Sequence, residues 1–121
     1  MTSIAEMDRH IRSLCEANEI SITFIGKDDE ARAVYWLREI FIVRIRSALD
    51  YATALHEVGH VLGRHQTSAV VLVRERWAWE WARRHAIEWT PAMEAHAQRC
   101  MDYYRAAPYR RVPNELIVSE D

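Results

Sequence analysis

Apolar residues near the start of the chain recur at intervals of three and four, the repeat that marks one face of an α-helix. They are Ile4, Met7, Ile11, Leu14 and Cys15. This spacing predicts an amphipathic helix over residues 3–18. We expect its apolar face to cover a small sheet formed by the residues that follow.

The next segment changes to short runs rich in β-branched and aromatic residues, which are typical of strands. Residues 20–25 alternate in this way and stop at the turn-forming run 26–29. Residues 32–37 and 39–45 have the same character and are expected to join tightly near Arg38. The pattern therefore predicts a three-stranded sheet.

Helical patterns return in the second half of the chain. The first of these helices is expected to start near Ser47 or Asp50, either of which suits an N-cap, and to end near Gly63. Two more are expected over residues 73–89 and 92–106, on either side of Pro91. The predicted fold class is α+β, with an N-terminal helix, a small three-stranded sheet and three further helices.

Composition limits the domain count and the class of partner. Half of the 121 residues are hydrophobic, which suits one compact domain; we expect it over residues 1–107, followed by an extended tail over residues 108–121. The net charge of −2 predicts no direct nucleic-acid partner, and no apolar run is long enough to cross a membrane. Two distant cysteines and no signal peptide indicate a reduced, cytoplasmic protein.

The strongest chemical signal is the pattern H-E-x-x-H at His56, Glu57 and His60. Histidines four residues apart lie on one face of a helix, so both imidazoles can bind one Zn²⁺. The intervening glutamate can act as general base on a zinc-bound water. The pattern lies within a predicted helix, as this chemistry requires, and indicates a small metal hydrolase.

A catalytic zinc site usually has a third protein ligand. The longer metzincin pattern requires a histidine where this chain has Gln66, and His65 falls one residue short. Two glutamates on the next predicted helix remain, Glu75 and Glu80. They are about 140° apart around a helix, and Glu80 lies among arginines on a solvated face. Glu75 shares the apolar face, so it is the preferred ligand.

Two motif blocks together resemble the ImmA/IrrE family of metallopeptidases. The first block is H-E-x-x-H, and the second matches the family pattern E-x-x-A-D/N-x-F/W-A at Glu75, Ala78, Trp81 and Ala82. The resemblance implies a zincin-like fold with Zn²⁺ bound by His56, His60 and Glu75, and Glu57 as the catalytic base. It also implies a protein substrate, namely a helix-turn-helix transcriptional repressor of a phage, a mobile element or a stress regulon.

The chain departs from the family pattern at Trp79, where the family has Asp or Asn. In related zincins an acid at this position accepts a hydrogen bond from a ligand imidazole. Asp102 is one residue considered as a substitute. Because the support of the histidines is altered, the alternative reading is a non-catalytic, zincin-like protein-binding module with a structural metal or none.

Further residues are candidates for the wall of a peptide cleft. The zincin comparison places Tyr35, Trp36 or residues 41–43 beside an extended substrate. The candidate oxyanion stabilisers are Tyr51, His65 and His85, each of which is more easily explained as structural or solvent-exposed.

Overall fold

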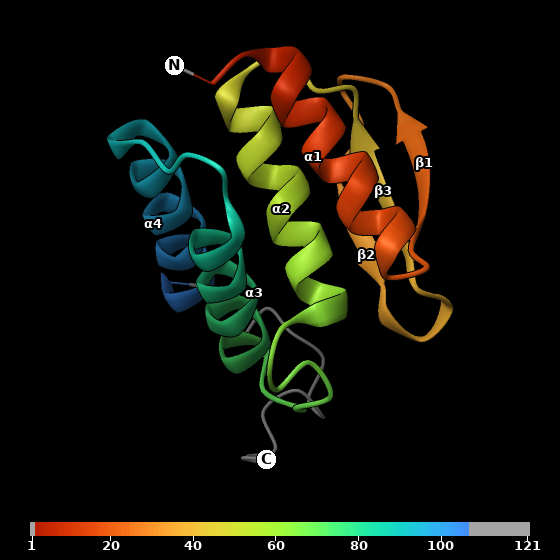
Figure 1. The fold of residues 1–121 in the computed structure, drawn as a ribbon. Helices are drawn as coiled ribbons and strands as arrows, with labels where there is room; N and C mark the ends of the chain where they lie inside the picture. Colours follow the sequence, from red (N-terminus) through yellow and green to blue (C-terminus); the bar gives the residue numbers. More distant parts are fainter. Residues whose placement is uncertain (1, 107–121) are drawn as a thin grey trace.

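The computed structural model describes residues 2–106 and has an α+β fold, as the sequence predicted (Figure 1). The elements are α1 (Ile4–Ala17), β1 (Ser21–Ile25), β2 (Arg32–Val34), the 3₁₀ turn η1 (Tyr35–Leu37), β3 (Glu39–Val43), α2 (Ala48–Leu62), α3 (Val71–His85) and α4 (Pro91–Ala106). The tail predicted for residues 108–121 lies outside the described residues. No helix within the described range is long and apolar enough to cross a membrane.

The sheet has the order β1-β3-β2, with β1 parallel and β2 antiparallel to the central strand β3. The strand predicted over residues 32–37 is correct only in its first half. Strand β2 ends at Val34, and residues 35–37 form η1 instead. The chain reverses at Arg38, whose φ of 49° lies in the left-handed region. Residues 41–43 belong to the central strand and cannot flank an extended peptide at a sheet edge, which corrects that expectation. The short β2 forms one edge of the sheet, and β1 forms the other.

Helix α2 forms the centre of the molecule, with α1 and the sheet on one side and α3 and α4 on the other (Figure 1). The side chain of Ser47 caps its N-terminus by accepting the backbone N–H of Asp50 at 3.1 Å. Nine of its fifteen residues are buried, including His56 and Glu57. A helix buried on nearly every side is expected to be apolar throughout, so these two polar residues need a specific chemical explanation.

Helix α3 ends at His85, four residues earlier than the sequence predicted. Ala86 is extended, with φ −65° and ψ 141°, and the backbone N–H of Ile87 donates to the hydroxyl of Tyr51 at 2.9 Å. That hydroxyl also lies 2.7 Å from Nδ1 of His10 on α1. Tyr51 is fully buried, so it links three parts of the fold and is a structural residue.

Helix α4 is held against α3 by an ion pair between Arg83 and Glu94. Nε and Nη2 of Arg83 lie 2.6 and 3.0 Å from the two oxygens of Glu94, which also accept from Trp89 and Gln98. The Arg83 guanidinium, with smaller help from these hydrogen bonds, lowers the pKa of Glu94 to about 2. This contact joins the start of α4 to α3, and Tyr104 lies near the other end of α4.

Candidate metal centre

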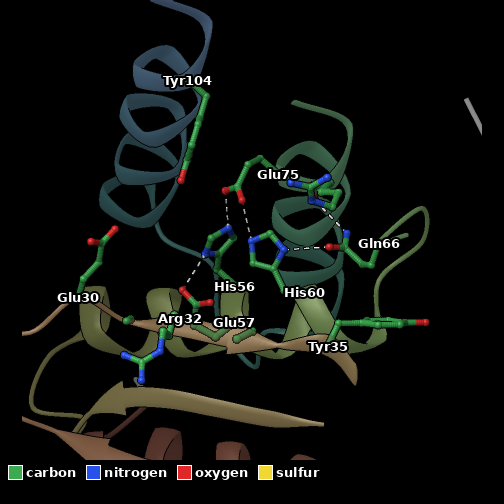
Figure 2. Close-up of a pocket in the computed structure, with 12 residues that line it drawn as sticks. Glu30, Arg32, Tyr35, His56, Glu57, His60, Gln66, Glu75 and Tyr104 are labelled. Carbon is green, nitrogen blue, oxygen red and sulfur yellow. Dashed lines mark hydrogen bonds and ion pairs between the residues drawn. The ribbon is translucent and has the colours of Figure 1, made fainter. Parts of the chain in front are cut away.

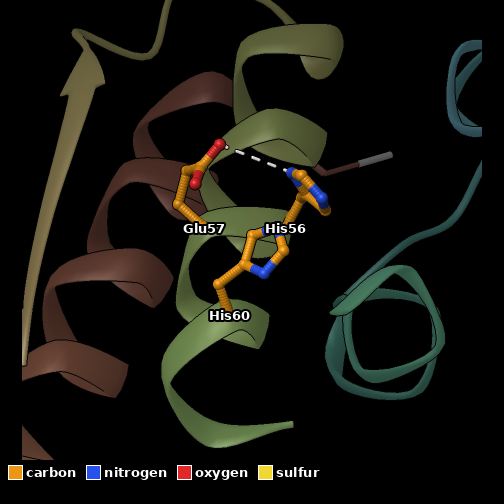
Figure 3. Close-up of side chains that lie close together, drawn as sticks. All are labelled: His56, Glu57 and His60. Carbon is orange, nitrogen blue, oxygen red and sulfur yellow. Dashed lines mark ion pairs between the residues drawn. The ribbon is translucent and has the colours of Figure 1, made fainter. Parts of the chain in front are cut away.

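Helix α2 brings the three residues of the H-E-x-x-H motif together, as helical spacing requires (Figure 3). The rings of His56 and His60 have centroids 4.5 Å apart. His56, Glu57 and His60 each offer a ligand atom, and these atoms lie within 4.8 Å of one another. His56 and Glu57 are only 9% and 5% exposed. The motif therefore forms a buried cluster with the donor types that divalent metals prefer.

Glu75 reaches this cluster from α3 (Figure 2). Its two carboxylate oxygens lie 3.0 Å from Nε2 of His56 and 2.8 Å from Nε2 of His60. Glu80 does not join it, since its side chain is 36% exposed and lies 3.8 Å from Arg84 on the outer face of α3. Of the two glutamates that the sequence offered, the structure brings Glu75 to the histidines.

The close approach of α2 and α3 depends on Gly59, which lies between the two histidines. A Cβ atom at this position would lie 2.4 Å from the backbone oxygen of Ala78 and 3.1 Å from its carbonyl carbon and Cα. Real contacts of a Cβ atom with backbone are essentially never that short. Glu75 lies one helical turn before Ala78 on the same face of α3. Because Gly59 has no side chain, α3 lies close enough to α2 for the Glu75 carboxylate to reach both imidazoles.

Electrostatics within the cluster favour charged groups in spite of burial. Burial opposes a charge on His56, but the carboxylates of Glu57 and Glu75 outweigh it and raise the pKa of this imidazole. Burial likewise opposes the charge on Glu75, but hydrogen bonds and attraction from both histidines hold the pKa of its carboxyl far below the ordinary value. An anionic carboxylate beside two imidazoles is ready to bind a cation that takes the place of the ring protons.

The donor set suits a divalent metal ion. Two imidazole nitrogens and one glutamate oxygen form the protein part of one common type of catalytic zinc site. Both Nε2 atoms face Glu75, whereas Glu57 lies 3.4 Å from Nδ1 of His56, on the other side of that ring. Because a metal held by the two Nε2 atoms would lie on the Glu75 side, Glu75 is the better third ligand and Glu57 is left beside the centre.

Trp79 occupies the position at which the family pattern has an acid, and it supports His56 by stacking. The two ring centroids are 4.1 Å apart and the planes differ by 15°. Trp79 is 1% exposed, and its indole N–H has no hydrogen-bond partner among the described residues. A buried unpaired donor typically costs about 1–3 kcal/mol. Asp102 does not take over the acid's place, because its side chain is 72% exposed and pairs with Arg105.

A cavity of about 310 Å³ opens beside the cluster. Its wall includes the edge strand β2, η1 and α4, and Figure 2 shows the side chain of Tyr104 reaching from α4 toward the pocket. The twelve lining residues are Glu30, Ala31, Arg32, Ala33, Tyr35, His56, Glu57, His60, Gln66, Arg74, Glu75 and Tyr104. The cavity thus joins the candidate metal ligands to the open edge of the sheet.

The structure separates the expected cleft residues into two groups. Tyr35 lines the cavity, but Trp36 does not, and it is 81% exposed. The three candidate oxyanion stabilisers all lie elsewhere: Tyr51 in the core, His65 beside Trp77 and His85 stacked on Trp81. None of the three lines the cavity, which agrees with the interpretation of these residues as structural or solvent-exposed.

Sequence reasoning missed Tyr104 and Arg74 as lining residues, and it missed the contact of Gln66 with His60. No local motif marks Tyr104, because its position depends on how α4 docks through Arg83 and Glu94. The position of Gln66 in the sequence did indicate a place near the metal, since it is the third ligand position of the longer metzincin pattern.

Comparison with known proteins did not identify the family. No family model matches the chain, and neither curated proteins nor solved structures give a significant match. The resemblance to ImmA/IrrE metallopeptidases stays a prediction from two motif blocks. The function of this chain is therefore inferred from the geometry of four residues, namely His56, Glu57, His60 and Glu75.

Proposed function

We propose that this protein is a zinc-dependent peptidase with a zincin-like arrangement, of the ImmA/IrrE type. His56, His60 and Glu75 would hold the metal, and Glu57 would act as the general base. The observation that carries the proposal is the convergence of both Nε2 atoms on Glu75, with the Glu57 carboxylate free of that contact and lining the same cavity.

Zinc at this position would supply a Lewis acid that lowers the pKa of a water molecule toward ~7 and polarises a substrate carbonyl. Glu57 would take a proton from the attacking water and deliver it to the leaving amine. Glu57 is only 5% exposed and lines the cavity wall, so little bulk water competes for that proton. Glu75 would hold its negative charge close to the cation throughout.

The edge strand β2 suits an extended peptide substrate. Its residues Arg32 and Ala33 line the same cavity as the four site residues, and β2 pairs only with β3 among the described strands. An open strand edge can add a peptide as a further strand through main-chain hydrogen bonds. A segment of a helix-turn-helix repressor, the target implied by the family resemblance, would have to become extended to bind there.

The test compares wild type with Glu57→Gln on zinc-loaded protein. Cleavage of a candidate repressor, or of a library of unstructured peptides, is followed by mass spectrometry. We expect the rate for Glu57→Gln to fall by about 10²- to 10⁴-fold, the usual contribution of a general base, while bound zinc stays the same. Glu80→Gln serves as the control, because it removes the same charge from the outer face of α3.

The alternative function is a non-catalytic protein-binding module that uses the metal for structure. The observation in its favour is Trp79, which replaces the family acid and gives His56 a stacked ring in place of a hydrogen-bond acceptor. If wild type and Glu57→Gln inactivate the repressor equally in cells, the peptidase proposal is wrong and the binding module is supported.

A further inference from the structure

Gln66 lies in the loop between α2 and α3, with its side chain directed at the candidate metal centre. It is 8% exposed. Its amide nitrogen donates to the backbone oxygens of Arg64 at 3.1 Å and Arg74 at 2.9 Å. Its amide oxygen lies 2.8 Å from Nδ1 of His60, a contact that is drawn as a dashed line in Figure 2. Both N–H groups of the Gln66 amide are thus hydrogen-bonded to backbone oxygens.

These contacts place a proton on Nδ1 of His60. Two carbonyl oxygens can only accept, so the group of Gln66 that faces them must be its NH₂. The amide oxygen must then face His60, and because this oxygen also only accepts, Nδ1 of His60 must be the donor. Nε2 of His60 faces the Glu75 carboxylate at 2.8 Å, and a carboxylate also only accepts. The proton on Nε2 is therefore the one that a metal would replace, while the proton on Nδ1 stays on the ring.

We propose that Gln66 is a positioning residue for His60, which it holds in the tautomer and ring orientation that bind a metal through Nε2. The inference rests on the proposed metal centre and adds a residue that the family motif does not contain. Trp79 offers His56 no hydrogen-bond acceptor, whereas Gln66 offers one to His60. One ligand imidazole of the proposed centre therefore keeps a hydrogen-bond partner.

The conformation of the loop makes this contact possible. Gln66 follows only six residues after His60, and α2 ends at Leu62. The chain then turns back through His65, whose φ of 59° is in the left-handed region, and the backbone N–H of Ser68 donates to the His65 oxygen at 3.1 Å. The two donations from the amide nitrogen tie this turn to the start of α3, so the amide oxygen is held in place before any metal binds.

Three substitutions separate positioning of His60 from simple stabilisation of the loop. Gln66→Glu keeps an acceptor for Nδ1 but loses the donors to the two backbone oxygens. Gln66→Lys keeps a donor for the backbone but loses the acceptor. Gln66→Met loses both at similar length. The measurements are zinc affinity, by competition with a chromophoric chelator, and the melting temperature of the metal-free protein.

Zinc affinity should follow the acceptor. We expect it to fall by about 10- to 100-fold in Gln66→Met and Gln66→Lys, the usual effect of losing a hydrogen-bond partner of a ligand imidazole, and to stay within about threefold of wild type in Gln66→Glu. Melting temperature should follow the donor instead, with Gln66→Lys above Gln66→Met. The NMR signal of the His60 Nδ1–H in zinc-loaded protein should exchange slowly with water in wild type and Gln66→Glu only.

Three results would overturn the inference, and they do so in two distinguishable ways. Zinc affinity that falls in Gln66→Glu as far as in Gln66→Met would make Gln66 a loop residue, as would equal affinity in all four proteins. Failure of the wild type to bind zinc would refute the metal centre itself, and the inference with it.

Discussion

Glu75→Gln is expected to lower the affinity of the protein for Zn²⁺ by more than about 100-fold. Loss of a residue that only hydrogen-bonds to a metal ligand costs up to about 100-fold, and loss of a ligand itself should cost more. The carboxylate contacts both imidazoles, at 3.0 and 2.8 Å, and supplies the negative charge that a cation between them requires. Glutamine keeps the shape of the side chain and loses that charge. The measurement is zinc competition with a chromophoric chelator at neutral pH.

Glu80→Gln is the matched control for this change. It removes the same charge from the same helix five residues later, where the side chain is 36% exposed and pairs with Arg84. Its zinc affinity should equal that of the wild type. If Glu80→Gln weakens zinc binding and Glu75→Gln does not, the assignment of the third ligand is wrong.

Gly59→Ala is expected to destabilise the metal-free protein by about 1–3 kcal/mol, the usual cost of overpacking a well-packed interior. The added Cβ would lie 2.4 Å from the backbone oxygen of Ala78, and backbone cannot rotate away as the end of a side chain can. This overlap outweighs the roughly 1 kcal/mol that alanine gains over glycine within an open helix. Urea unfolding measures the change.

The same substitution should also weaken zinc binding, because α3 must move away from α2 and take Glu75 with it. Gly26→Ala is the control, since a Cβ atom there would meet only the end of the Asp29 side chain, at 3.0 Å. Unchanged or higher stability of Gly59→Ala would show that the two helices do not depend on this close approach.

The order of the elements was predictable because each follows from local spacing. The helical repeat between Ile4 and Cys15, the cap at Ser47 and the stop at Gly63 all act within a few residues. The choice of Glu75 over Glu80 was also accessible, since five residues along a helix put the two carboxylates on different faces. In both cases the geometry of one element suffices.

Features that depend on contacts between elements were not predictable. Strand β2 ends at Val34 and is followed by η1, and α3 ends two residues before Ile87, whose N–H donates to the hydroxyl of Tyr51 on α2. The sequence showed that Trp79 replaces an acid, but not that its ring stacks on His56. In the sequence, Gln66 only stands where the longer metzincin pattern has a ligand histidine. Its contact with His60 depends on the turn at His65, which no local pattern marks.

The most direct test of the metal centre is zinc K-edge X-ray absorption on the purified, zinc-loaded wild type. The account predicts one zinc per chain with about two imidazole nitrogens at about 2.0–2.1 Å, oxygen as the remaining ligand and no sulfur. Cys100 lies 3.9 Å from Nε2 of His96 on α4 and is the competing source of ligands. A sulfur scatterer at about 2.3 Å, or a chain that binds no zinc, would contradict a centre formed by His56, His60 and Glu75.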